Sequence, residues 1–149
     1  MYANTFGANR EKLAHCGRTV AEVVPAAVSV AREAARGRGR VALDVGPIGQ
    51  LLEPTGTLEF EQAVDIFAEV VEAGAAAGAD LIAIETMTDL QEARAALLAA
   101  REHSSLPVLV TMTYEATGRT FLGCSPACAA LTLEGLGADA IGVNCPLGP

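Results

Sequence analysis

Apolar residues recur along the chain in two alternating patterns. Stretches with an apolar residue every three or four positions predict amphipathic helices. These helices cover about residues 9–35, 59–77, 89–103 and 125–133. Short apolar runs rich in Val, Ile and Leu lie between them and predict buried parallel strands. These strands cover residues 41–45, 81–84, 108–112 and 140–144. Thr57 is the expected N-terminal cap of the second helix.

Regular alternation of strand and helix predicts an α/β fold with a parallel sheet and right-handed crossovers. Polar residues end the four strands at Asp44, Glu85, Thr113 and Asn144-Cys145, 28 to 41 positions apart. A complete eight-stranded αβ barrel of ~250 residues has ~31 residues per unit and collects its functional groups at the strand ends. A barrel is therefore favoured, with an open doubly wound sheet as the alternative.

The length indicates that only part of such a barrel is present. The chain has 149 residues, and Tyr2-Ala-Asn-Thr-Phe6 resembles the end of a further strand. We therefore expect one incomplete domain over residues 1–149, a partial (β/α)8 TIM barrel with about strands 2 to 6 and the helices between them. An incomplete barrel would leave sheet edges open.

Composition narrows the possible partners and location. The net charge is −8, only 4% of residues are aromatic and none is Trp, which argues against a nucleic-acid partner. No uninterrupted apolar segment is long enough to span a membrane, and the N-terminus lacks the pattern of an export signal. We expect a soluble cytoplasmic protein whose four cysteines are reduced thiols rather than a disulfide framework.

Four motifs together resemble the homocysteine S-methyltransferase domain, above all as it occurs in cobalamin-dependent methionine synthase. They are Asn4-Thr-Phe-Gly-Ala-Asn-Arg10, Asp44-Val-Gly-Pro-Ile-Gly49, Ile84-Glu-Thr-Met-Thr-Asp89 and Gly142-Val-Asn-Cys-Pro-Leu-Gly-Pro149. Their order and spacing match over nearly the whole chain, and the last motif is the most specific.

The resemblance implies a zinc site that contains Cys145. In the family, the cysteine of the Gly-Val-Asn-Cys segment is one of three zinc ligands, and an adjacent Cys-Cys pair supplies the other two. No such pair occurs in this sequence, so the metal site is expected to be incomplete and the isolated chain inactive. Zinc held by thiolates can take a substrate sulfur at its open position and remove its proton.

Three further residues are candidates for substrate binding. The resemblance implies that Glu85 contacts the amino group of homocysteine, and a buried carboxylate there would need such a cationic partner. Its structural alternatives are capping of residues 86–89 or pairing with an arginine. Asn144 could orient the substrate or fix the cysteine loop. Asp44 could face the substrate or, as turn chemistry favours, bond to the Gly46-Pro47 backbone.

The sequence therefore predicts methyl transfer to the zinc-activated thiol of homocysteine, which gives methionine. Methyl-cobalamin on another module is the favoured donor, with S-methylmethionine and betaine as alternatives. Two other functional classes stay open: a metal-independent barrel lyase or aldolase that uses Glu85 as acid and base, and a non-catalytic barrel fragment. Cys124 and Cys128 are four residues apart at a helix start and could form a metal pair, but no His or Cys cluster accompanies them, so structural roles are favoured.

Overall fold

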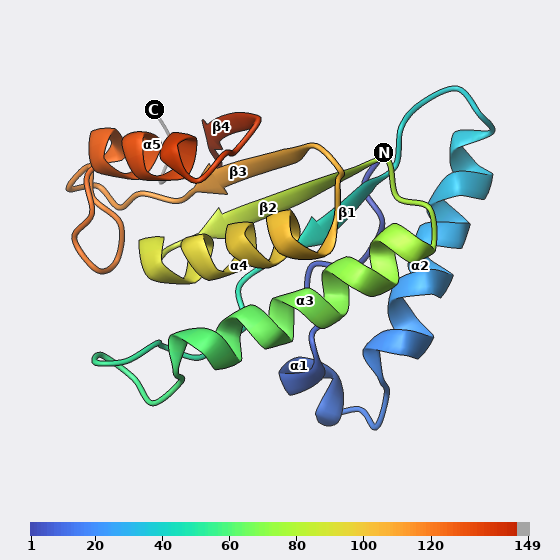
Figure 1. The fold of residues 1–149 in the computed structure, drawn as a ribbon, viewed down its shortest axis with the longest axis horizontal. Coiled ribbons are helices and arrows are strands. Elements are labelled where there is room, and N and C mark those ends of the chain that lie inside the picture. The colour runs from blue at the N-terminus through green and yellow to red at the C-terminus, as the bar shows by residue number, and fades with distance from the viewer. Residues whose placement is uncertain (146–149) are drawn as a thin grey trace.

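The computed structural model describes residues 1–145, which form an α/β fold (Figure 1). The helices are α1 (Arg10–Ala14), α2 (Val20–Ala35), α3 (Phe60–Ala76), α4 (Leu90–His103) and α5 (Pro126–Gly135). The strands are β1 (Ala42–Val45), β2 (Leu81–Met87), β3 (Val108–Met112) and β4 (Ala140–Val143). The predicted alternation of strand and helix is confirmed.

The four strands form one parallel sheet in the order β1-β2-β3-β4. Strands that are consecutive in the sequence are also neighbours in the sheet, as in successive units of a barrel. Tyr2 makes an isolated parallel bridge with Ala42, so the first residues run beside β1 as the sequence predicted. All four strands point the same way, and their carboxyl ends gather Asp44, Glu85, Thr113 and Asn144 at one edge of the sheet.

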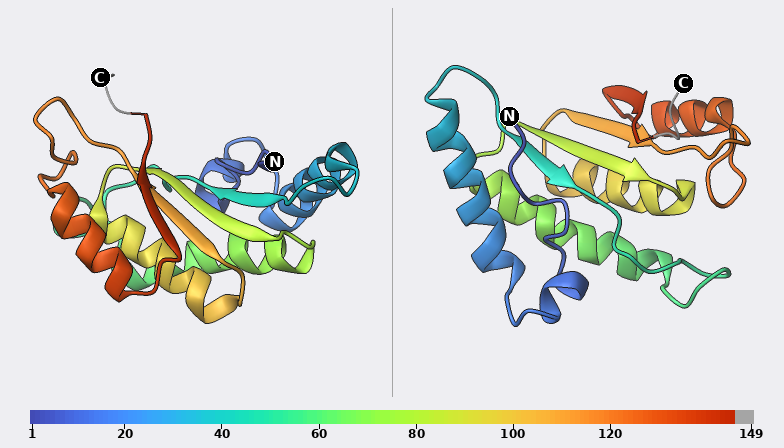
Figure 2. Two further views of the ribbon diagram at one scale, coloured as in Figure 1. Left: turned by 90° about the horizontal axis from the view of Figure 1, so that it is seen from above. Right: turned by 180° about the vertical axis from the view of Figure 1, so that it is seen from behind.

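Helices α3, α4 and α5 lie on one face of the sheet, which the view from above shows clearly (Figure 2). Leu43 of β1 faces this layer, because a Cβ atom on Gly74 of α3 would come within 2.5 Å of its side chain. Since successive strand residues point to opposite faces, Asp44 points to the other face. Apolar strand side chains such as Leu43 therefore pack against the helix layer, whereas Asp44 lies on the opposite face of the sheet.

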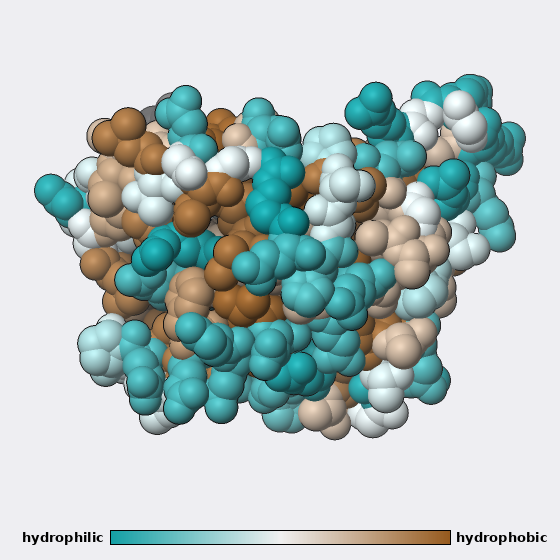
Figure 3. All heavy atoms as spheres, viewed as in Figure 1, coloured by the Kyte–Doolittle hydropathy of each residue, from teal (hydrophilic) through white to brown (hydrophobic). Residues whose placement is uncertain are grey.

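Small residues allow helix and strand to approach closely in this layer. On α4, the alanines that face the sheet are fully buried. The opposite side of the helices is charged, and Figure 3 shows mostly hydrophilic side chains over α3 with apolar patches toward α5. Leu131 of α5 is 72% exposed, so the helix layer is less completely covered at this end.

Three details of the predicted elements are wrong. Residues 9–35 form two helices, because Gly17 adopts φ +65° and Thr19 then starts α2 with a capping box to Glu22. Glu59 rather than Thr57 caps α3, because the chain is still extended at Leu58, which bridges to Leu52. Strand β2 also continues three residues beyond its predicted end, through Met87.

Within residues 1–145, no helix combines the length and the apolar character that a membrane-spanning segment needs.

Candidate functional site

Asp44 lies at the carboxyl end of β1 and is only 8% exposed. Its backbone is fixed by Thr5, whose hydroxyl donates to the Asp44 carbonyl at 2.8 Å and accepts from the Asp44 amide at 3.0 Å. The Oδ1 atom of Asp44 is buried without a hydrogen-bond partner. The predicted bond to the Gly46-Pro47 turn is wrong, because the Gly46 amide donates to the Phe6 carbonyl instead.

Glu85 supplies a second carboxylate beside Asp44. Burial, with a smaller contribution from the negative charge of Glu85, raises the pKa of Asp44 from 3.8 to about 7. In the described part of the chain, Glu85 forms no ion pair with an arginine. It does not cap the next helix either, because Asp89 does so through the Gln91 amide. Neither structural alternative for Glu85 is present among residues 1–145, and the ends of β1 and β2 bring two acidic groups near enough for the charge of Glu85 to act on Asp44.

The backbone changes direction directly after Glu85. The pairing of β2 with β3 is irregular between Ile84 and Met87, and Thr86 adopts φ +62°. A positive φ is a genuine outlier for a β-branched residue, and such bulges re-aim side chains near functional sites. No pattern of residues predicts this bulge beyond its place at a strand end.

Asn144 holds this strained turn in place from β4. Its side-chain amide donates to the Thr86 hydroxyl at 2.8 Å, and its Oδ1 accepts from the Thr86 amide at 3.1 Å. Thr113 donates its hydroxyl proton to the Asn144 carbonyl at 3.0 Å. Asn144, the residue before Cys145, is thus bonded to Thr86 and Thr113. Contact of Asn144 with a substrate stays a prediction.

Cys145 follows immediately and is exposed, also with a positive φ of 49°. Its Sγ lies 4.0 Å from the Thr86 hydroxyl, so the two strained residues face each other across the ends of β2 and β4. The side chain is not packed in the apolar core. This is the accessible position that a metal-binding thiol needs.

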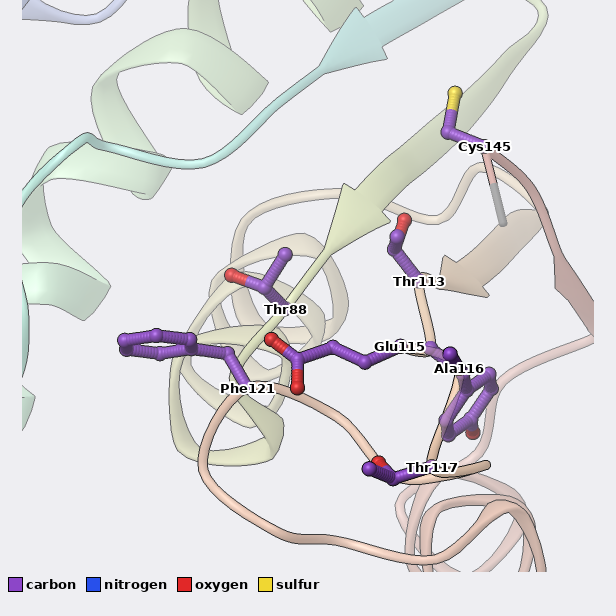
Figure 4. Close-up of a pocket in the computed structure, with 8 residues that line it drawn as sticks. Thr88, Thr113, Glu115, Ala116, Thr117, Phe121 and Cys145 are labelled. Atoms are coloured by element: carbon purple, nitrogen blue, oxygen red, sulfur yellow. The ribbon is translucent and has the colours of Figure 1, made fainter. Parts of the chain in front are cut away.

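A pocket of about 540 Å³ opens beside Cys145. Its wall comes mainly from the segment that follows β3. The lining residues are Thr88, Thr113, Tyr114, Glu115, Ala116, Thr117, Phe121 and Cys145 (Figure 4). Cys145 and the Phe121 ring lie toward opposite ends of this pocket, with Thr113 between them. Tyr114, Glu115 and Phe121 lie in a loop, and a loop has no periodic pattern from which to predict that its side chains line a pocket.

No group of three possible metal-binding side chains occurs among residues 1–145. Cys145 fits zinc as one soft thiolate ligand, but it has no companion ligands within this part of the chain. Cys124 and Cys128 lie at the start of α5, where burial and a hydrogen bond with Cys128 raise the pKa of Cys124. A raised pKa disfavours the thiolate form of Cys124 that a metal requires, and a structural role for the two cysteines stays a prediction.

The sequence of this chain is similar to that of a known protein family. The sequence matches the homocysteine S-methyltransferase family over residues 1–149. The chain belongs to this family. It is 31% identical to a methionine synthase of Mycobacterium tuberculosis over 98% of its length, and 36% identical to a methionine synthase of Mycobacterium leprae over 70%.

Solved structures agree in fold. The metallated form of the homocysteine methyltransferase MmuM from Escherichia coli matches 97% of the chain with a TM-score of 0.83 at 22% identity. The apo form of MmuM matches with a TM-score of 0.71 at 23% identity. These matches confirm the predicted partial TIM barrel. The chain spans 13% and 9% of the length of the two methionine synthases, and 57% of the metallated MmuM chain.

Proposed function

We propose that this chain is the homocysteine-binding part of an enzyme that methylates homocysteine to give methionine. Membership of the homocysteine S-methyltransferase family supports the reaction class. The observation that carries the proposal is the pair of carboxylates at Asp44 and Glu85, which has no cationic partner among residues 1–145. An amino acid with an ammonium group would supply that partner.

Asp44 and Glu85 would bind the substrate ammonium between the ends of β1 and β2. Because the pKa of Asp44 is about 7, part of the population carries a proton near neutral pH. A bound ammonium favours the ionised carboxylate, so substrate binding should release a proton from Asp44. The two carboxylates thus orient the amino acid with its other end toward Cys145.

Cys145 would be one ligand of a zinc ion, with the remaining ligands supplied from outside residues 1–149. The zinc ion, when bound, would lower the pKa of the homocysteine thiol so that it reacts as a thiolate. Thr86 and Asn144 would hold the cysteine turn. In the reaction, a sulfur lone pair forms the new bond to carbon, the bond between methyl and donor breaks, and the thiol proton leaves to solvent.

We place the methyl donor on another part of the full-length protein and favour methyl-cobalamin. The similarity to two methionine synthases, each much longer than this chain, supports a multi-module parent. S-methylmethionine and betaine remain the alternative donors. A cytoplasmic location belongs to the same proposal, because a zinc-binding thiol at position 145 must stay reduced.

The test uses the full-length protein that contains this chain. Cys145→Ser should abolish bound zinc and methionine formation, whereas Glu85→Gln should keep zinc and raise KM for homocysteine. Cys16→Ser is the matched control, because this exposed thiol follows α1 and does not line the pocket beside Cys145. Full activity and full zinc content in Cys145→Ser would overturn the zinc proposal. Loss of a lyase or aldolase activity in Glu85→Gln, with that activity unchanged in Cys145→Ser, would support a metal-independent barrel enzyme instead.

A further inference from the structure

Two charged side chains grip the peptide group between Pro47 and Ile48 from its two ends. Glu92 of α4 accepts a hydrogen bond from the Ile48 amide at 2.7 Å. Lys12 of α1 donates its ammonium proton to the Pro47 carbonyl at 2.7 Å. Each bond is charge-assisted, and the carboxylate polarises the peptide in the same sense as the ammonium. The orientation of this peptide plane is therefore fixed from two helices that are distant in sequence.

Glu92 occupies an unusual position for a carboxylate, since its residue is only 4% exposed. Burial, the largest cause, raises the pKa of Glu92 to about 7. The Ile48 hydrogen bond and the charge of Lys12 oppose this rise, whereas the charge of Asp89 adds to it. An apolar side chain of similar size could fill this space without the cost of desolvating a carboxylate. The hydrogen bond that the Glu92 carboxylate accepts from the Ile48 amide is the physical reason for an acid here.

The gripped peptide lies three residues beyond Asp44, in the loop that leaves β1. The neighbouring Gly46 packs so closely on Phe6 that a Cβ atom would come within 2.5 Å of the ring. The Lys12 ammonium lies 5.6 Å from the centre of that same ring. Phe6, Gly46 and the Pro47–Ile48 peptide thus pack together at the carboxyl end of β1.

We infer that Glu92 and Lys12 are positioning residues, which clamp the Pro47–Ile48 peptide and thereby fix the Asp44 carboxylate at the substrate end of β1. Both side chains bond to this peptide and Glu92 is buried, so each acts through the loop rather than on a substrate. The inference rests on the proposed function only in that Asp44 is taken to bind the substrate ammonium.

Hydrogen exchange and the titration of Asp44 test the clamp without any assay of activity. In the full-length protein, Glu92→Leu should speed exchange of the Ile48 amide by about tenfold or more, because its acceptor is lost. The pKa of Asp44, followed by NMR with labelled aspartate, should fall from about 7 toward its ordinary range as the loop loosens. Glu92→Gln keeps an acceptor oxygen and should preserve both values.

Leu97→Ala is the matched control, because Leu97 is fully buried on the same helix and the clamp does not involve it. It should weaken the protein without a selective effect on Ile48 or Asp44. An unchanged Ile48 amide or an unchanged Asp44 titration in Glu92→Leu would overturn the inference. So would equal changes in Leu97→Ala, because the effect would then be general loosening.

A kinetic measurement links the clamp to the reaction. Glu92→Leu should raise KM for homocysteine by about tenfold with a smaller change in kcat, since Asp44 is displaced rather than removed. Glu92→Gln should restore KM. If the wild-type protein does not methylate homocysteine, the proposed function fails, whereas the exchange and titration results still decide the clamp. If it does and KM is unchanged in Glu92→Leu, the positioning role is refuted.

Discussion

The two ends of the sheet contrast in how their site residues are held. At β1 every residue is buried, and Asp44 is fixed by Thr5, by the first residues of the chain and by the clamped loop. At β4 most residues are exposed, with Val143 at 56%, and Cys145 depends on hydrogen bonds among Thr86, Thr113 and Asn144. Among residues 1–145, the carboxylate half of the candidate site is thus built into the core, whereas the thiol half is held by polar contacts after the last described strand. The comparison teaches that substitutions of one chemical type should have different effects at the two ends.

Truncation of an apolar strand residue should separate the two ends most strongly. Leu43→Ala removes a fully buried side chain from β1 and should lower the free energy of unfolding by about 2–5 kcal/mol. Ile141→Ala in β4 is the matched change, and it should have a smaller effect because Ile141 is 37% exposed. Urea unfolding followed by circular dichroism measures both. Equal losses would contradict the contrast between the two strands.

Replacement of a glycine by alanine should lower stability more after β1 than in β4, but by a smaller difference than the truncations above. Gly46→Ala would place its Cβ against the Phe6 ring and should destabilise by about 1–3 kcal/mol, because the clamped loop cannot shift easily. Gly142→Ala in β4 would meet only a Thr111 methyl group at 3.3 Å and should be nearly neutral. Thermal unfolding of the two variants under one condition checks this. A tolerated Gly46→Ala would show that the β1 loop is less rigid than its contacts indicate.

The pH dependence of stability should have opposite signs at the two ends. The pKa of Asp44 is raised to about 7, so its protonated form favours the folded state. This contribution is complete below the unfolded pKa and is lost as pH rises toward 7, by up to about 1.4 kcal/mol per pH unit. Asp44→Asn should flatten that loss. Asp139, just before β4, has a lowered pKa because it accepts hydrogen bonds from the Val108 amide and from Arg101. Its contribution should instead be lost as pH falls.

Unfolding of wild type and Asp139→Asn below about pH 4 tests the sign for Asp139, and unfolding of wild type and Asp44→Asn from about pH 4 to 8 tests the sign for Asp44. Glu92 has a raised pKa as well, so some loss with rising pH should persist in Asp44→Asn. A wild-type curve that rises through this range and is unchanged by Asp44→Asn would be inconsistent with a buried acid at the end of β1.

Loss of the Asn144 amide should give the smallest and most local effect. Asn144→Ala removes the two hydrogen bonds to Thr86 and should cost about 1 kcal/mol or less in overall stability. The strained turn should relax, so the Cys145 thiol should react faster with an alkylating reagent. Asn4→Ala, at an exposed position, is the control. An alkylation rate for Cys145 that matches wild type would mean that other contacts hold the turn.

Local pattern was enough to predict most of the secondary structure and the edge of the sheet where the site lies. Apolar runs set the four strands, and their polar final residues placed Asp44, Glu85 and Asn144-Cys145 together, because parallel strands share one carboxyl edge. The predictions failed where side chains compete locally. Thr19 and Gly17 divided the first helix, and Glu59 displaced Thr57 as a cap.

The pocket wall and the bulge at Thr86 had no sequence signal, because loops and irregular pairings carry no period. By residue type alone, Glu92 would be expected at an exposed position of its helix. Its burial is explained only by the hydrogen bond that it accepts from the Ile48 amide.

The amino-acid sequence by itself determined the order of strands and helices and the residues that end each strand, since both follow from short-range periodicity. The family resemblance rested on four local motifs, which the match over residues 1–149 confirms. Only the tertiary structure decided which partners these residues have: Asn144 holds Thr86, Asp44 lacks a bond to its own turn, and Glu92 reaches the β1 loop. The reason is physical. Hydrogen bonds and charge interactions depend on distances between segments far apart in the chain, and no periodic pattern along a sequence encodes those distances.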